Sequence, residues 1–234
     1  MLYRALRRST ILKALLGREP FHLPQGSWDL EFHGSSYGGW SILRDSLNSK
    51  SNVYSVGIGE DPSFDLSLIA KYGCRVLAYD PTPRAVRWVE RHVTNPLFVM
   101  HALALADHDG DLRLFLPLPI SADPVSASMY PSASANEPIS VPCRTLGSLL
   151  SECPQRNCDL LKMDIEGAEY GVIRQAAAEG WLEGTKQLLV EFHHWVPGIG
   201  VATTLEAVRT LRAIGFCIAW VSRTNHEYLF VRAG

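Results

Sequence analysis

The sequence lacks the features that would place it in a membrane, secreted or nucleic-acid-binding class. No stretch approaches the ~20 apolar residues of a membrane-spanning helix. The five cysteines are odd in number and irregularly spaced, which excludes a disulfide framework and predicts reduced thiols in the cytoplasm. A net charge of −2 with no basic stripe predicts no nucleic-acid partner. With 47% apolar and 20% charged residues among 234, the composition is typical of one soluble globular domain.

The N-terminal segment is basic and leucine-rich but has no long apolar core. Arg4, Arg7 and Lys13 are interleaved with leucines, and no small-residue cleavage site follows, so we expect no secretory signal. A basic amphipathic helix of this kind either packs on the flank of the domain, which we expect, or lies on a membrane surface. We therefore divide the chain into an N-terminal helix and linker, residues 1–32, and a main domain, residues 33–234.

A short apolar strand that runs into a Gly-x-Gly turn is the most informative stretch. The strand ends at Val56, the turn contains Gly57 and Gly59, and a helix then leads to a second buried strand that ends at Asp80. In this order α/β folds bind an adenosine-containing cofactor, with glycines close to the ligand and an acid, about twenty residues on, near the ribose hydroxyls. A tight turn in an ordinary α/β domain would show the same two glycines. Residues elsewhere must therefore decide whether this turn binds a cofactor.

The residues after the turn indicate which cofactor is bound. A dinucleotide site needs a third glycine and a helix N-terminus that receives a pyrophosphate. Here Glu60 and Asp61 would repel phosphate, and Pro62 removes an amide donor. S-adenosylmethionine has a sulfonium, an ammonium and no phosphate, so it fits better than a nicotinamide dinucleotide. An NAD(P)-dependent oxidoreductase is kept as the alternative.

Ionisable residues gather where the later strands are expected to end. A strand over residues 159–163 is followed by Asp164, Glu166 and Glu169, and one over residues 187–192 by His193. Ligands of open α/β sheets lie beyond the carboxyl ends of the strands, so these residues predict an active site. Glu166 and Glu169 are also explained as acids at a helix N-terminus.

Four segments together resemble the FkbM-type methyltransferases, near their methyltransferase-like branch, and the resemblance covers about residues 33–232. It implies a Rossmann-like class I methyltransferase: a seven-stranded, mostly parallel sheet with an antiparallel last strand and helices on both faces. It also implies methyl transfer from S-adenosylmethionine, with S-adenosylhomocysteine as product, to a hydroxyl of a small molecule or sugar. Ser55 and Pro62 depart from the usual pattern, which leaves a non-catalytic cofactor-binding module as a further alternative. The segments are residues 53–61, 79–82, 161–169 and 190–193.

These arguments give a set of candidate site residues. For catalysis, Asp164 is the first choice as base or acceptor anchor, followed by Glu166 and His193. Asp164, Glu191 and His193 also offer one ligand each for a divalent ion, which is possible but not favoured. Asp107 is explained equally by an adenine contact and by a turn. The cofactor-binding candidates are Tyr37, Gly57, Gly59, Glu60, Asp61, Asp80, Pro81 and Asp107.

Two loops and one helix complete the expectations. Residues 33–40 contain three glycines and two aromatics, which favours a loop that closes over a ligand, with a turn under a core Trp as the alternative. Residues 41–47 are expected to form a short helix. Residues 117–138 contain five prolines and no periodicity, which indicates either an acceptor-side flap or an insertion without function. The acceptor and the oligomeric state are not determined by the sequence.

Overall fold

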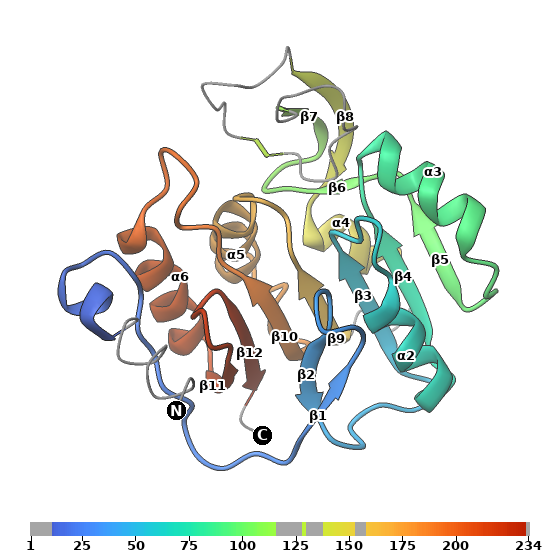
Figure 1. The fold of residues 1–234 in the computed structure, drawn as a ribbon. Helices are drawn as coiled ribbons and strands as arrows, with labels where there is room; N and C mark the ends of the chain where they lie inside the picture. The colour runs from blue at the N-terminus through green and yellow to red at the C-terminus, as the bar shows by residue number, and fades with distance from the viewer. Residues whose placement is uncertain (1–10, 116–127, 130–137, 153–157, 233–234) are drawn as a thin grey trace.

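A seven-stranded sheet forms the centre of the protein. It is seen in a computed structural model that describes residues 11–115, 128–129, 138–152 and 158–232 (Figure 1). The strand order is β11-β12-β10-β9-β3-β4-β5. β12 is antiparallel to both of its neighbours, and the other pairings are parallel, which confirms the expected sheet. The strands are β3 (Asn52–Val56), β4 (Arg75–Tyr79), β5 (Phe98–His101), β9 (Cys158–Met163), β10 (Thr185–Glu191), β11 (Phe216–Val221) and β12 (Glu227–Arg232).

Helices cover both faces of this sheet because its central strands are apolar on both sides. In β9, Leu160 packs in the core cluster of one face, while Leu161 and Met163 pack in that of the other. This alternation is the period of two that a strand imposes on its side chains. The first face is covered by α2 (Ser63–Tyr72) and α3 (Pro83–His92), and the second by α4 (Leu146–Ser151), α5 (Glu169–Ala178) and α6 (Val201–Ala213).

The expected short helix over residues 41–47 is wrong. Residues Trp40–Leu43 form β2, which pairs antiparallel with β1 (Leu30–His33). Trp40 and Ile42 are buried in the core cluster under α2, and the side chain of Gln187 accepts a hydrogen bond from Leu43 N at 2.8 Å. Tertiary contacts therefore decide the conformation of a run too short to show a clear period.

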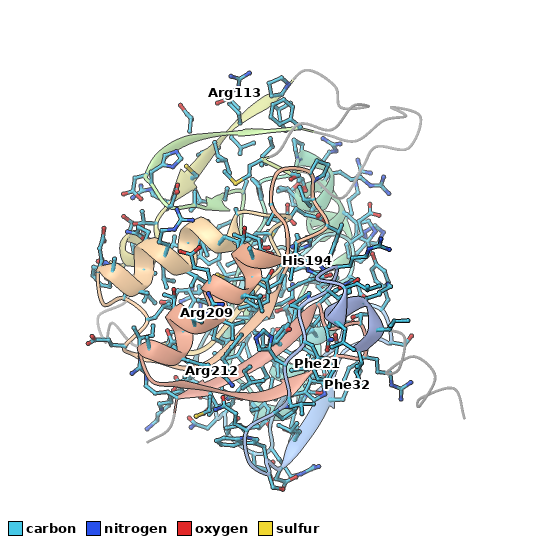
Figure 2. The ribbon with its side chains drawn as sticks, turned by 90° about the vertical axis from the view of Figure 1, so that its left-hand side faces the viewer. Phe21, Phe32, Arg113, His194, Arg209 and Arg212 are labelled. Carbon is cyan, nitrogen blue, oxygen red and sulfur yellow. The ribbon has the colours of Figure 1, made fainter. Side chains whose placement is uncertain are left out.

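The N-terminal segment is hydrogen-bonded to the side of the sheet where β11 and β12 form the edge. Figure 2 shows this side of the molecule, with Phe21 on the segment and Arg209 and Arg212 on α6. Leu15 is 80% exposed, so the described turn of the N-terminal helix does not pack its leucines on the domain. None of the helices in the described ranges has the length and apolar character needed to cross a bilayer. The fastening bonds are His194 Nε2 to Glu19 Oε2 (2.8 Å), Asn225 Nδ2 to Pro20 O (3.1 Å), His22 Nδ1 to Tyr228 Oη (3.1 Å) and Gln25 N to Ile218 O (2.7 Å).

A three-stranded sheet stands above the C-terminal ends of the central strands (Figure 1). Its order is β6-β8-β7, from β6 (Ala104–Leu105), β7 (Gly110–Leu114) and β8 (Ile139–Arg144). The predicted flap at residues 117–138 lies between β7 and β8 and falls mostly outside the described residues. Of the part that is described, Ser128 donates a hydrogen bond from Oγ to Glu166 O at 2.6 Å, which brings this segment to the end of β9.

Asp65 on α2 is a buried carboxyl group beneath the glycine turn. Burial raises its pKa to about 6, although Lys162 and Ser55 oppose the shift. The folded state therefore holds this proton more tightly than the unfolded state, whose aspartate has a pKa near 3.9, and the ionised group costs stability as the pH rises through this window.

We expect Asp65→Asn to stabilise the protein at neutral pH. A pKa raised to about 6 corresponds to ~3 kcal/mol, so the gain in unfolding free energy should be absent near pH 4, grow up to about pH 6 and stay constant above it. Urea unfolding of both proteins across this range is the measurement. A gain that is equal at all pH values would show that Asp65 does not titrate in this window.

Candidate active site

A cavity of about 420 Å³ opens at the C-terminal ends of β3, β4, β9 and β10. The glycine turn forms one wall, and the residues that follow β9 and β10 form the opposite end. Leu112 and Leu114 of β7 form an apolar roof together with Leu105. The cavity therefore lies where open α/β sheets bind their ligands, with an apolar side suited to an aromatic ring.

The glycine turn needs glycine for two separate reasons. Gly57 and Gly59 have φ angles of 82° and 58°, in the left-handed region that other residues avoid. A Cβ atom on Gly57 would also lie 1.7 Å from the carbonyl oxygen of Asp164. Gly57 therefore lets β3 and β9 approach each other directly beneath the cavity.

Asp80 holds the glycine turn in place. Its Oδ2 accepts hydrogen bonds from Ile58 N at 3.0 Å and Gly59 N at 2.9 Å. Its Oδ1 accepts from Thr82 N at 2.8 Å and from Thr82 Oγ1 at 2.6 Å. Asp80 is 5% exposed but still lines the cavity. The amides that would receive a pyrophosphate are thus already paired with a carboxylate of the chain.

The two acids after the turn are also engaged. Arg84 donates to both carboxylate oxygens of Glu60 at 2.7 Å, and these hydrogen bonds lower the pKa of Glu60. Asp61 accepts from Ser35 Oγ at 2.5 Å and from Ser63 N at 3.1 Å. Burial alone would raise the pKa of Asp61, but the bonds from Ser35 and Ser63 outweigh it and the pKa is lowered. Asp61 therefore ties the loop over residues 33–40 to the start of α2 and places negative charge there.

The remaining cofactor candidates divide into two groups. Tyr37 and Pro81 line the cavity, and Tyr37 is 93% exposed at its mouth. Asp107 does not line it: its Oδ1 lies 2.9 Å from His108 Nδ1, and its side chain is half-exposed next to α5. The structure therefore places Asp107 in a turn, as the alternative explanation had it.

The opposite end of the cavity is formed by Asp164, Glu166, Glu191 and His193, which we call the acidic end. His193 Nε2 lies 3.6 Å from Asp164 Oδ1 and 3.6 Å from Glu166 Oε2, beyond hydrogen-bond distance. Glu166 has a φ of 53°, a conformation that a non-glycine residue keeps only when its surroundings hold it. Burial raises the pKa of Glu191 to about 8, and the charge of Asp164 adds to the shift.

Glu169 orients His193 from below. It is fully buried, and its Oε1 accepts from His193 N at 2.9 Å and lies 3.2 Å from His193 Nδ1. Its Oε2 accepts from Gly167 N at 2.9 Å. Burial alone would lower the pKa of His193, but the hydrogen bond to Glu169 and the nearby acids raise it to about 10. The sequence could not assign Glu169 this role, because its spacing equally fits an acid at a helix N-terminus.

Four further residues line the cavity without being among the candidate site residues. Lys162 lies inside β9, where it donates to Gly57 O at 2.6 Å, and its Nζ is 3.8 Å from Asp164 Oδ2. Leu112 and Leu114 alternate with polar residues and could not be told from ordinary core positions. Trp195, which is 48% exposed, reaches the cavity from the loop after β10.

Comparison with known proteins matches this chain to one family over most of its length. The sequence profile of the methyltransferase FkbM domain matches residues 52–218, which include the glycine turn, Asp80 and the whole acidic end. The chain is similar to a probable methyltransferase-like protein 24 from Homo sapiens, with 33% identity over 180 residues. The Rattus norvegicus protein of the same name is 32% identical over 158 residues.

These relatives are longer than the matched region. The two alignments cover 72% and 67% of this chain but 42% and 36% of the relatives, so the chain spans about two fifths of their length. Among solved structures, a fibrillarin pre-rRNA processing protein from Methanococcus jannaschii aligns with a TM-score of 0.47 and 13% identity, over 80% of this chain and 68% of its own.

Proposed function

The chain belongs to the FkbM methyltransferase family, and from that premise we propose that it transfers the methyl group of S-adenosylmethionine to a hydroxyl oxygen of a small molecule or a sugar. The adenosine and methionine parts would bind along the glycine turn, and the acceptor would bind at the acidic end. Asp80, Pro81 and Tyr37 are the proposed contacts on the adenosine side.

The pairing of Asp80 with the glycine-turn amides is the observation that carries this proposal. Ile58 N and Gly59 N donate to Asp80, and Ser63 N at the start of α2 donates to Asp61. A dinucleotide needs such amides for its pyrophosphate, and here carboxylates occupy them. A phosphate would therefore meet two carboxylates, and the amides of Ile58, Gly59 and Ser63 already donate to them. A ligand with a ribose, a sulfonium and an ammonium meets neither problem, which favours the methyltransferase over an oxidoreductase.

Methyl transfer to a hydroxyl requires alignment and removal of one proton. The acceptor oxygen attacks the methyl carbon in line with the carbon–sulfur bond, whose electrons pass to sulfur, and S-adenosylhomocysteine leaves. We assign Asp164 as the anchor of the acceptor hydroxyl and Glu166 as the group that takes its proton. His193, held by Glu169, lines the same cavity and places its Nε2 3.6 Å from a carboxylate oxygen of each.

Transfer of a labelled methyl group tests the proposal directly. The full chain is incubated with S-adenosylmethionine carrying a ¹³C methyl group and with pooled polyols, sugars and phenols, and the products are read by NMR. We expect a new methyl signal with the chemical shift of an oxygen-bound methyl. A signal on nitrogen or carbon would overturn the choice of acceptor atom. An absence of any product from a protein that binds S-adenosylhomocysteine, across broad acceptor pools, would favour the non-catalytic binding module.

A further inference from the structure

Two carboxylates and one imidazole face one another at the acidic end. Asp164, Glu191 and His193 each offer one ligand atom, and these atoms lie within 4.8 Å of one another. Asp164 comes directly after β9, Glu191 ends β10, and His193 follows two residues later. The parallel pairing of β9 with β10 therefore brings them together, and all three line the cavity.

The orientation of His193 is fixed by a group that leaves one ring nitrogen for the cavity. Glu169, fully buried, lies 3.2 Å from Nδ1, and its other bonds to His193 N and Gly167 N hold the carboxylate still. Nε2 consequently faces the acidic end. A buried carboxylate on one nitrogen, with the other aimed at further ligands, is the usual surrounding of a metal-binding histidine.

The charge at the acidic end also favours a bound cation. Asp164, Glu166 and Glu191 converge there, and Glu169 lies directly behind. Lys162, the neighbouring cation on β9, directs its Nζ at Gly57 O, 2.6 Å away, while its distance to Asp164 Oδ2 is 3.8 Å. A cation bound among these partly buried carboxylates would offset the cost of their lost hydration.

We propose that Asp164, Glu191 and His193 bind one divalent metal ion, of the Mn²⁺ or Mg²⁺ type that favours carboxylate oxygens. This inference rests on the proposed methyl transfer and names the acceptor class more closely. Three protein ligands in an octahedral ion leave positions for two neighbouring acceptor oxygens, as in a vicinal diol or a hydroxy acid. The metal lowers the pKa of the bound hydroxyl. Its proton passes to Glu166, the oxygen bonds to the methyl carbon, and the carbon–sulfur electrons remain on S-adenosylhomocysteine.

Manganese binding tests the site apart from turnover. The full chain is stripped with EDTA and titrated with Mn²⁺, and free Mn²⁺ is counted by electron paramagnetic resonance. We expect one ion per chain, and at least ~10-fold weaker binding in both Asp164→Asn and Glu191→Gln. In the transfer assay, EDTA should remove activity and Mn²⁺ should restore it, whereas activity unchanged by EDTA would overturn the proposal.

A second cluster in the described residues supplies the matched control. Glu19, His194 and His226 also lie within ligand distance of one another, where the N-terminal segment meets the domain, and none of the three lines the cavity. Glu19→Gln should leave the Mn²⁺ stoichiometry and affinity unchanged. Loss of the ion in Glu19→Gln but not in Asp164→Asn would overturn the proposal, as would a wild-type chain that binds no Mn²⁺. A chain that binds S-adenosylhomocysteine but not Mn²⁺ would overturn the metal site and leave the proposed function standing. A chain that binds Mn²⁺ but not S-adenosylhomocysteine would overturn the proposed function and leave the metal site standing.

Discussion

Replacing Gly57 by alanine is expected to destabilise the protein by more than ~4 kcal/mol and to abolish binding of S-adenosylhomocysteine. The left-handed φ of 82° alone costs alanine about 1–2 kcal/mol. The larger part comes from the new Cβ, which would lie 1.7 Å from the backbone oxygen of Asp164 and so force β3 and β9 apart at the floor of the cavity. Urea unfolding and calorimetric titration measure the two effects.

Gly73→Ala separates the strain of the backbone from the clash. Gly73 ends α2 with a φ of 64°, but a Cβ there meets nothing closer than Ser49 Cβ at 3.8 Å. It should therefore cost only about 1–2 kcal/mol and leave ligand binding intact. A Gly57→Ala protein as stable as Gly73→Ala and still able to bind the ligand would contradict the close approach of β3 and β9.

Replacing Asp164 by asparagine is expected to lower kcat for methyl transfer by about 10²–10⁴-fold. The amide keeps the size of the side chain but removes the charge that anchors the acceptor. It also removes a carboxylate ligand of the proposed metal ion, which activates the acceptor hydroxyl. Affinity for S-adenosylhomocysteine, whose sulfur is uncharged, should change less than threefold, because Asp164 lies at the acidic end rather than along the glycine turn. Steady-state kinetics and calorimetry are the measurements.

Asp111→Asn is the control for this substitution. Asp111 is exposed on β7, next to the roof of the cavity but outside it, so the same chemical change there should leave kcat unaltered. Equal losses in the two variants would mean that charge in general, and not the position of Asp164, sets the rate. An Asp164→Asn protein with normal kcat would show that Asp164 does not anchor or activate the acceptor.

The central sheet was predictable because its strands are short, apolar and punctuated by glycine and acid. The strand before Gly57 and the strand that ends before Asp80 are found where the sequence placed them. The antiparallel strand that the family resemblance implied is β12. The β1–β2 hairpin was not predictable, because Trp40 and Ile42 become a strand through burial against α2 and through the bond from Leu43 N to Gln187. The bond to Gln187 joins residues that lie 144 positions apart in the sequence.

The sequence predicted which residues line the candidate site better than it predicted their hydrogen-bond partners. The rule that ligands lie beyond strand ends found Asp80, Asp164, Glu166 and His193, which the structure brings to one cavity. It could not show that Asp80 accepts hydrogen bonds from the glycine-turn amides, because a spacing in the sequence does not determine which donors a carboxylate binds. Asp107 also follows a strand, yet it lies next to Gly171 of α5 and does not line the cavity.

The most direct test of the central claim is a parallel titration of the chain with S-adenosylhomocysteine, S-adenosylmethionine and NADH. At about 100-fold above its dissociation constant, a ligand adds ~2.7 kcal/mol of stability, which calorimetry and thermal unfolding resolve. We predict that both adenosyl sulfur compounds stabilise the protein and that NADH does not. The effect should disappear in Asp80→Ala and persist in Asp107→Ala. Stabilisation by NADH alone would contradict the account, because the glycine turn would then accept the pyrophosphate that its pairing with Asp80 excludes.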